Sequence, residues 1–181
     1  MTTQATAEVL VQQDGLHRVE LLGSFPHPHW LAFLCGGLSA AGVSVVSGRA
    51  VRSAPLLWEG HLVVAGMVAD LDIVALASRR PPTRDAAAPA LSWATVERRY
   101  DGRLELRLEA ADALGFLGRL LGRISLLTLL PSEVEIATED GRICDRFVLS
   151  GIGTSSPGDD VLDALRAMLA GMTGHARVPY A

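Results

Sequence analysis

The stretch 103–150 changes its pattern of apolar positions twice. It begins with an alternation of period two, which predicts a strand with one buried face and apolar positions at Leu104, Leu106 and Leu108. Apolar residues at helical spacing follow, and they predict a helix whose buried face comprises Leu114, Leu117, Leu120 and Leu121. Two further strands are predicted next, joined by a turn at Glu139-Asp140-Gly141.

The first part of the chain has the same order of patterns. Asp14-Gly15 is a strong hairpin signal, because both residues tolerate a positive φ. Gly42 suits the end of a helix. The predicted elements are strands at 7–12 and 16–23, a helix at 30–41, strands at 43–52 and 56–68, and a short helix capped by Asp70 that ends at Ala77.

An internal repeat relates the two parts. A second Asp-Gly turn, Asp101-Gly102, follows a predicted strand at 91–99 and lies 87 positions after the first. The same shift superposes the apolar positions of the following strand and helix, Val19 on Leu106 and Trp30 on Leu117 among them, and a shift near 85 superposes the later strands. The chain is therefore predicted to contain two units, 1–89 and 90–181, with a linker at 83–89.

The last helix has its own start signals. Ser156 is a candidate N-cap, Pro157 suits the first helical position, and Asp159 lies three residues after the cap. The apolar stripe of this helix extends to Met172, and the tail after it is predicted as an edge strand or as disordered chain.

The predicted order in each unit is therefore a strand, a hairpin turn, a strand, a helix, two strands and a second helix. Helices segregated to one face of an antiparallel sheet define an α+β fold. The hairpin 135–149 and this order of elements resemble the ACT domain, as found in glycine-cleavage repressor-like proteins and bacterial uridylyltransferases. The resemblance implies two ferredoxin-like βαββαβ units, in which the strand before each Asp-Gly turn supplies the edge that normally follows the second helix.

The resemblance also implies where a ligand binds. ACT domains often carry an Asp-Arg-Pro-Gly turn between first strand and first helix, where backbone amides and a helix N-terminus meet the ligand. The second unit has Asp112-Ala113-Leu114-Gly115 there, which keeps the acid and the glycine, and the first unit has Phe25-Pro26-His27-Pro28. The candidate ligand-binding residues are Ser24, Phe25, His27, His29, Trp30, Ala111, Asp112, Ala113, Leu114 and Gly115.

Some of these residues have simpler interpretations. His27-Pro28-His29 either shapes its loop, contacts a ligand, or holds a metal or moves protons. Asp112 either caps the following helix or contacts a ligand. The three tryptophans, Trp30, Trp58 and Trp93, are more typical of a core or an interface than of a binding box.

Composition removes several classes of function. All 16 basic residues are arginine, so a Schiff-base lysine, a phosphate-loop lysine and a lysine general base are excluded. The net charge of −4 argues against a nucleic-acid surface. Cys35 and Cys144 lack metal or redox spacing, and we expect both to be small buried hydrophobes. No glycine-rich nucleotide loop and no G-x-S-x-G motif is present.

These observations rank three functions. The first is a non-catalytic regulatory protein that senses a small, amino-acid-like metabolite and acts as a homodimer or on a regulated partner. The alternative is an enzyme or accessory protein of a specialised-metabolite pathway that binds a more apolar substrate, and the third is a structural interaction module. We expect no cofactor, no metal and no catalytic residue. We also expect a cytoplasmic protein, since no apolar run reaches the ~18 residues of a membrane span and the start lacks a secretion signal.

Overall fold

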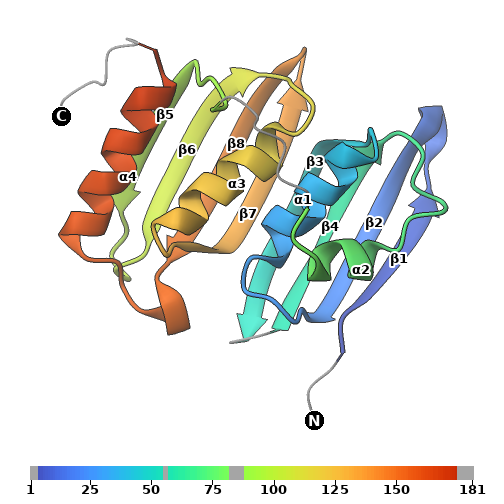
Figure 1. The fold of residues 1–181 in the computed structure, drawn as a ribbon, viewed down its shortest axis with the longest axis horizontal. Helices are drawn as coiled ribbons and strands as arrows, with labels where there is room; N and C mark the ends of the chain where they lie inside the picture. Colours follow the sequence, from blue (N-terminus) through green and yellow to red (C-terminus); the bar gives the residue numbers. More distant parts are fainter. Residues whose placement is uncertain (1–3, 55–56, 82–87, 175–181) are drawn as a thin grey trace.

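The computed structural model describes residues 4–54, 57–81 and 88–174, and each half of the chain follows the predicted order of elements (Figure 1). The first half contains β1 (Thr6–Val11), β2 (Leu16–Ser24), α1 (Trp30–Ala40), β3 (Ser44–Ala54), β4 (Leu57–Ala65) and α2 (Ile73–Ser78). The second half contains β5 (Trp93–Arg98), β6 (Leu104–Ala111), α3 (Phe116–Leu126), β7 (Leu130–Glu139), β8 (Arg142–Ser150) and α4 (Asp159–Met172).

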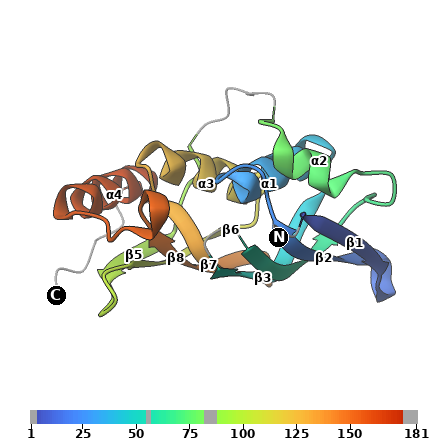
Figure 2. The ribbon, with the colours of Figure 1, turned by 90° about the horizontal axis from the view of Figure 1, so that it is seen from below.

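The eight strands of the described residues form one antiparallel sheet in the order β1-β2-β4-β3-β7-β8-β6-β5. The helices lie on one face of it, as the α+β prediction requires (Figure 2). Within each half the arrangement is ferredoxin-like, with β1 and β5 as the outer strands that precede rather than follow the rest. The sheets of the two units join into one, because the edge strands β3 and β7 satisfy each other's free backbone groups.

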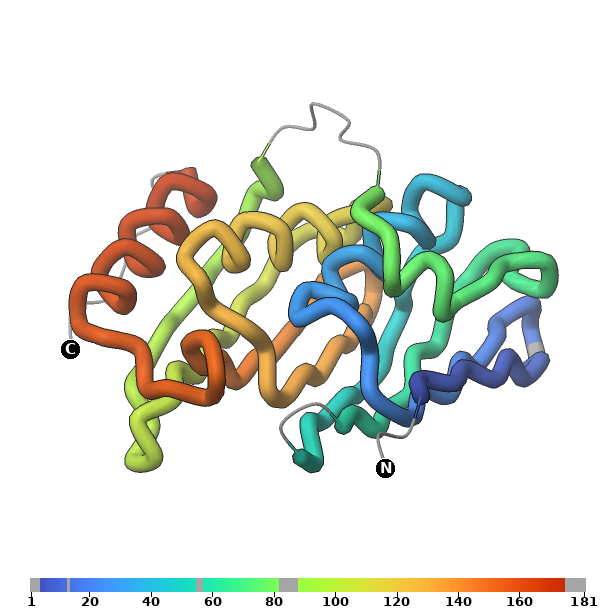
Figure 3. Tube along the Cα trace, turned by 60° about the horizontal axis from the view of Figure 1, so that its bottom comes forward, coloured from blue at the N-terminus to red at the C-terminus, as the bar shows by residue number. Residues whose placement is uncertain are grey.

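The pairing of β3 with β7 relates the two halves by an approximate two-fold axis. Arg49 lies opposite Glu135, 86 positions further on (135 − 49). At the same offset, Gly48 is equivalent to Val134 and Ala50 to Ile136. In the sheet Gly48 lies opposite Ile136 and Ala50 opposite Val134, which is the exchange that a two-fold axis between the halves requires. The side chains of Arg49 and Glu135 form an ion pair, with Nε and Oε1 3.9 Å apart. The tube view follows both halves on either side of this junction (Figure 3).

The repeat offset of 87 fits the first two strands of each half but not the helices. Val19 pairs with Leu62 and Leu106 pairs with Phe147, so β2 and β6 correspond as predicted. The buried positions of the two helices correspond at an offset of 86 instead: Trp30, Leu31, Leu34, Cys35 and Leu38 match Phe116, Leu117, Leu120, Leu121 and Ile124. The reason is the loop before each helix, which spans 25–29 in the first half and only 112–115 in the second.

The predicted start of α3 was wrong in two respects. Leu114 is half exposed and precedes the helix, so it does not belong to the buried stripe. Asp112 is not the N-cap. Gly115 takes that position with a φ of 78°, because the chain turns there through the left-handed region that glycine adopts without strain.

The N-caps of α2 and α4 lie two residues after the predicted positions. Asp72, rather than Asp70, caps α2, and its carboxylate accepts the Ala75 N–H at 2.9 Å. Helix α4 begins at Asp159 after Gly158, so Ser156 is not its N-cap. The extended backbone of Gly158, with ψ at 170°, delays the first helical turn beyond Pro157.

The two cysteines differ in burial. Cys35 is buried in α1, as predicted, whereas Cys144 is exposed, so that prediction was wrong. Cys144 is next to buried Asp145 on β8, and neighbouring residues of a strand face opposite sides of the sheet. Predicted linker residues 83–87 and the tail 175–181 lie outside the described residues. No helix within the described ranges is long and apolar enough to cross a membrane.

The sheet face without helices is charged in the second half. Glu105 accepts hydrogen bonds from Arg146 and Arg107, which hold its pKa down at about 2. Arg103 links Asp101 to Glu133 on the same face. The opposite, helix-covered face holds the apolar core and the pockets described next.

Candidate functional site

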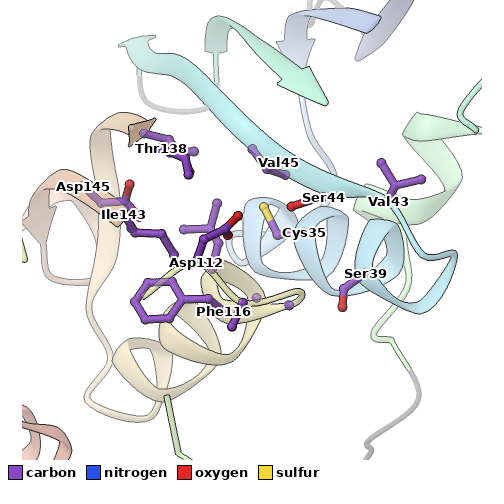
Figure 4. A pocket seen from close by; sticks show the side chains of 15 residues that line it. Cys35, Ser39, Val43, Ser44, Val45, Asp112, Phe116, Thr138, Ile143 and Asp145 are labelled. Carbon is purple, nitrogen blue, oxygen red and sulfur yellow. The ribbon is translucent and has the colours of Figure 1, made fainter. Parts of the chain in front are cut away.

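The larger pocket lies on the helix side of the sheet, where the two halves meet (Figure 4). The start of α3 and its preceding loop form one wall, and the second half of α1 with the start of β3 forms the other. β7 and β8 close the remaining side through Ile136, Thr138, Ile143 and Asp145. The hollow has an empty volume of about 370 Å³, part of it open to solvent.

Glycines hold the walls close together. A Cβ added at Gly118 would lie 2.9 Å from the Gly36 nitrogen, so α1 and α3 meet backbone to backbone. A Cβ at Gly115 would lie 2.5 Å from the Ser39 hydroxyl oxygen. A larger residue at Gly118 would push the helices apart, because its Cβ would meet backbone atoms. At Gly115 the Ser39 hydroxyl could turn away, and the φ of 78° is what favours glycine there.

Asp145 is a buried carboxylate in the pocket lining, with 3% of its surface exposed. Its recorded hydrogen bond comes from the Ala137 N–H at 3.3 Å. The β7–β8 pairs stop at Glu135↔Arg146 and resume at Thr138↔Ile143. The Ala137 N–H therefore has no partner in this strand pair, and it donates to the Asp145 carboxylate instead. Burial raises the pKa of Asp145 to about 7. The group is consequently poised between its neutral and charged forms near neutral pH.

Cys35 faces the same hollow from α1. Burial, and to a lesser extent the charge of Asp145, raise the pKa of its thiol far above the usual range. The thiol is therefore neutral and a poor nucleophile. In Figure 4 the side chains of Cys35 and Asp112 turn toward the same space from opposite walls. Asp112 is exposed at the rim, and its N–H donates to the Gly141 carbonyl at 2.9 Å.

The first strand-to-helix loop is packed rather than open. The Phe25 ring stacks on Trp30 with centroids 4.0 Å apart, and Trp30 meets the edge of Trp58 at 5.1 Å. His27 Nδ1 accepts the His29 N–H at 3.1 Å, so the first imidazole shapes its own loop. Burial, and the charge of His27, lower the pKa of His29.

A second, smaller pocket lies at the other end of the helix pair, with an empty volume of about 270 Å³. All its lining residues except Pro28 have a counterpart in the larger pocket at the offset of 86, or of 85 for β4 and β8. His29, Trp30, Leu31 and Ala32 correspond to Gly115, Phe116, Leu117 and Gly118, while Trp58, Leu121, Leu129 and Pro131 correspond to Ile143, Cys35, Val43 and Val45.

This correspondence shows how the two pockets diverged. His29 occupies the place of Gly115, and Trp58 occupies the place of Ile143. Gly60 stands at the position equivalent to Asp145, so the smaller pocket has no counterpart of the buried carboxylate. Larger aromatic side chains narrow the pocket at the first loop, whereas glycines leave more room in the pocket at the second loop.

The structure divides the ten predicted site residues among different places. Asp112, Ala113 and Gly115 line the larger pocket, and His29 and Trp30 line the smaller one. Neither pocket is lined by Ser24, Phe25, His27, Ala111 or Leu114. The two loops lie at opposite ends of the α1–α3 pair, so they do not share one site.

Sequence reasoning missed Cys35, Ser39 and Asp145. A signal for Asp145 was present, because it interrupts the apolar alternation of Ile143, Phe147 and Leu149. Cys35 and Ser39 belong to the other half of the chain, and no local pattern connects them with residues 112–115. Within the described part of the chain, no group of three His, Cys, Asp or Glu side chains is arranged to hold a metal ion.

Comparisons with known proteins assign no family to this chain. No protein-family model matches the sequence, and no curated protein matches it significantly. One similar solved structure is aspartate kinase from Synechocystis, with a TM-score of 0.48 and 14% identity. The match covers 84% of this chain and 27% of the kinase chain, so this chain spans about a quarter of that protein. A similarity of this size leaves the function to be inferred from the pocket.

Proposed function

We propose that this chain is a non-catalytic, tandem ACT-like protein that binds one small molecule in the larger pocket, beside residues 112–115. The observation that carries the proposal is the difference between the two equivalent pockets. One is narrowed by His29, Trp30 and Trp58, and the other keeps Gly115 and Gly118 and a buried carboxylate. A buried carboxylate without a charged partner lowers stability, and such groups cluster at functional sites.

The position of the pocket supports a regulatory role. Its walls come from both halves, with α1 and β3 on one side and α3, β7 and β8 on the other. A bound molecule would contact both halves together and would favour the arrangement that it binds most tightly. The protein that receives this signal, whether a second copy of the chain or a regulated partner, stays a prediction that light scattering and affinity capture would address.

The enzymatic alternative has weaker support. The neutral, buried thiol of Cys35 does not suit nucleophilic catalysis. His27 is engaged with its own loop and lies against Phe33 with ring centroids 4.5 Å apart. These contacts favour a structural role for the histidine pair over acid–base work.

Thermal unfolding against a panel of small metabolites tests the proposed function. We expect at least one compound to raise the midpoint by a few degrees, because a ligand that binds only the folded state stabilises it by mass action. Cys35→Leu copies the residue at the equivalent position, Leu121, and should fill the pocket and abolish the shift. A panel without any stabilising compound, or a shift that Cys35→Leu leaves intact, would contradict the proposal.

A further inference from the structure

The charges around the larger pocket are distributed unevenly. Among the described residues, its lining contains two carboxylates, Asp145 on the buried side and Asp112 at the rim, and no basic side chain. The rest of the lining is largely apolar, with Phe116, Ile136 and Ile143 prominent. An apolar hollow with carboxylates and no cation suits a ligand that has an aliphatic body and a positive end.

Arg119 of α3 lies beside the pocket but outside its lining. Arg119 Nη1 donates to the Leu114 carbonyl at 3.0 Å, and it would be 3.0 Å from a Cβ at Gly115. This nitrogen is thus engaged by the loop at the edge of the pocket, while Arg119 Nε is buried and has no hydrogen-bond partner among the described residues. A ligand carboxylate would have to meet Arg119 there, beyond the hollow, whereas an ammonium group would meet Asp145 inside it.

We infer that the pocket binds a small aliphatic primary amine, with its ammonium group at Asp145 and its alkyl body against Phe116, Ile136 and Ile143. This inference rests on the proposed function and names the chemical class of its ligand. A carboxylate on the ligand contributes nothing inside the pocket, because Asp112 and Asp145 would repel it.

The pH dependence of binding follows from the protonation of Asp145. The groups that face it are the neutral Cys35 thiol on α1, the Asp112 carboxylate on the loop and Thr138 on β7, with Arg119 of α3 beyond the rim. The charged form of Asp145 binds ammonium, and its pKa is about 7. Affinity should therefore be greatest above neutral pH and should fall as the pH drops below it.

Calorimetric titration of the full chain with two matched probes tests the inference. The probes are 3-methylbutylamine and leucine, which share the alkyl body and the amino group and differ in the carboxylate. We expect the amine to bind more tightly at about pH 8 than at about pH 6, and leucine to bind weakly or not at all. Asp145→Asn should weaken amine binding about ten- to a hundredfold, as expected for the loss of a charged hydrogen bond.

Two further variants complete the design. Asp163→Asn removes an exposed carboxylate on α4, at 74% side-chain exposure, and should leave amine binding unchanged. Cys35→Leu should abolish amine binding by filling the hollow. Tighter binding of leucine than of the amine would overturn the amine inference and leave the proposed function standing, as would equal amine binding by Asp145→Asn. Failure of both probes and of the whole metabolite panel would overturn both.

Discussion

Asp145 occupies a position on β8 whose neighbours on the same face are apolar. Ile143, Phe147 and Leu149 are each no more than 5% exposed, and the carboxylate lies among them with one recorded backbone hydrogen bond. Its pKa in the folded chain, about 7, exceeds the usual 3.8 because burial disfavours the charge. The folded state therefore binds a proton more tightly than the unfolded state does between these two pH values.

This difference predicts how Asp145→Asn changes the free energy of unfolding. The contribution of Asp145 to wild-type stability should fall as the pH rises from about 4 to about 7, since the folded carboxylate must ionise in place, at a cost of up to about 4 kcal/mol. The amide avoids that charge but buries an N–H group without a partner, at about 1–3 kcal/mol. We expect the variant to be about 1–3 kcal/mol more stable than wild type at pH 8, and equal or less stable at about pH 4.

Urea unfolding of both proteins at the two pH values measures this. Asp163→Asn serves as the control, because its exposed carboxylate should give little difference at either pH. An Asp145→Asn variant that is less stable than wild type at pH 8 would mean that the native carboxylate is stabilised by a charged partner.

At the scale of elements, the contact between α1 and α3 sets the shape of the pocket. Gly118 is the contact point, where an added Cβ would lie 2.9 Å from the Gly36 nitrogen and 3.2 Å from the Cys35 carbonyl carbon. Backbone atoms cannot turn away as a side-chain tip can. Any side chain at this position must separate the two helices.

Two glycines of α3 provide a matched pair of substitutions. Gly118→Ala should lower the free energy of unfolding by about 1–3 kcal/mol, the usual range for overpacking a well-filled contact. Gly122→Ala, one helical turn later, meets nothing within 4 Å and should raise it by about 0.5–1 kcal/mol, because alanine favours the helix. Urea unfolding compares them directly, and equal effects of the two changes would show that the helix contact is not tight.

Much of the element order was predictable, since it depends on local periodicity. The alternation of Leu104, Leu106 and Leu108 identified β6, and Asp14-Gly15 identified the first hairpin. The residues at which the helices begin were harder to predict. Asp112 and Ser156 have the right chemistry for caps, but the left-handed turn at Gly115 and the extended backbone at Gly158 decide where α3 and α4 begin.

At the scale of the whole molecule, the junction between the two halves determines which residues line the larger pocket, and the sequence alone did not predict this junction. The pairing of β3 with β7 brings Cys35 of the first half close to Asp112 and Asp145 of the second. The loop 112–115 was predicted as a site by resemblance, yet its opposite wall depends on this long-range contact. The narrowing of the equivalent pocket by Trp58 likewise becomes visible only when the two halves are superposed in space.

Because the two halves carry equivalent pockets, one titration can test the central claim that only the larger pocket binds a ligand. An amide NMR titration of the labelled full chain with 3-methylbutylamine at pH 8 reports on both pockets at once. The account predicts one binding event per chain, with shifts concentrated at residues 112–118, at Cys35 and at Asp145, and without matching shifts at His29–Ala32 or Trp58. Two equivalent binding events, or shifts concentrated at Trp58 and the first loop, would contradict it.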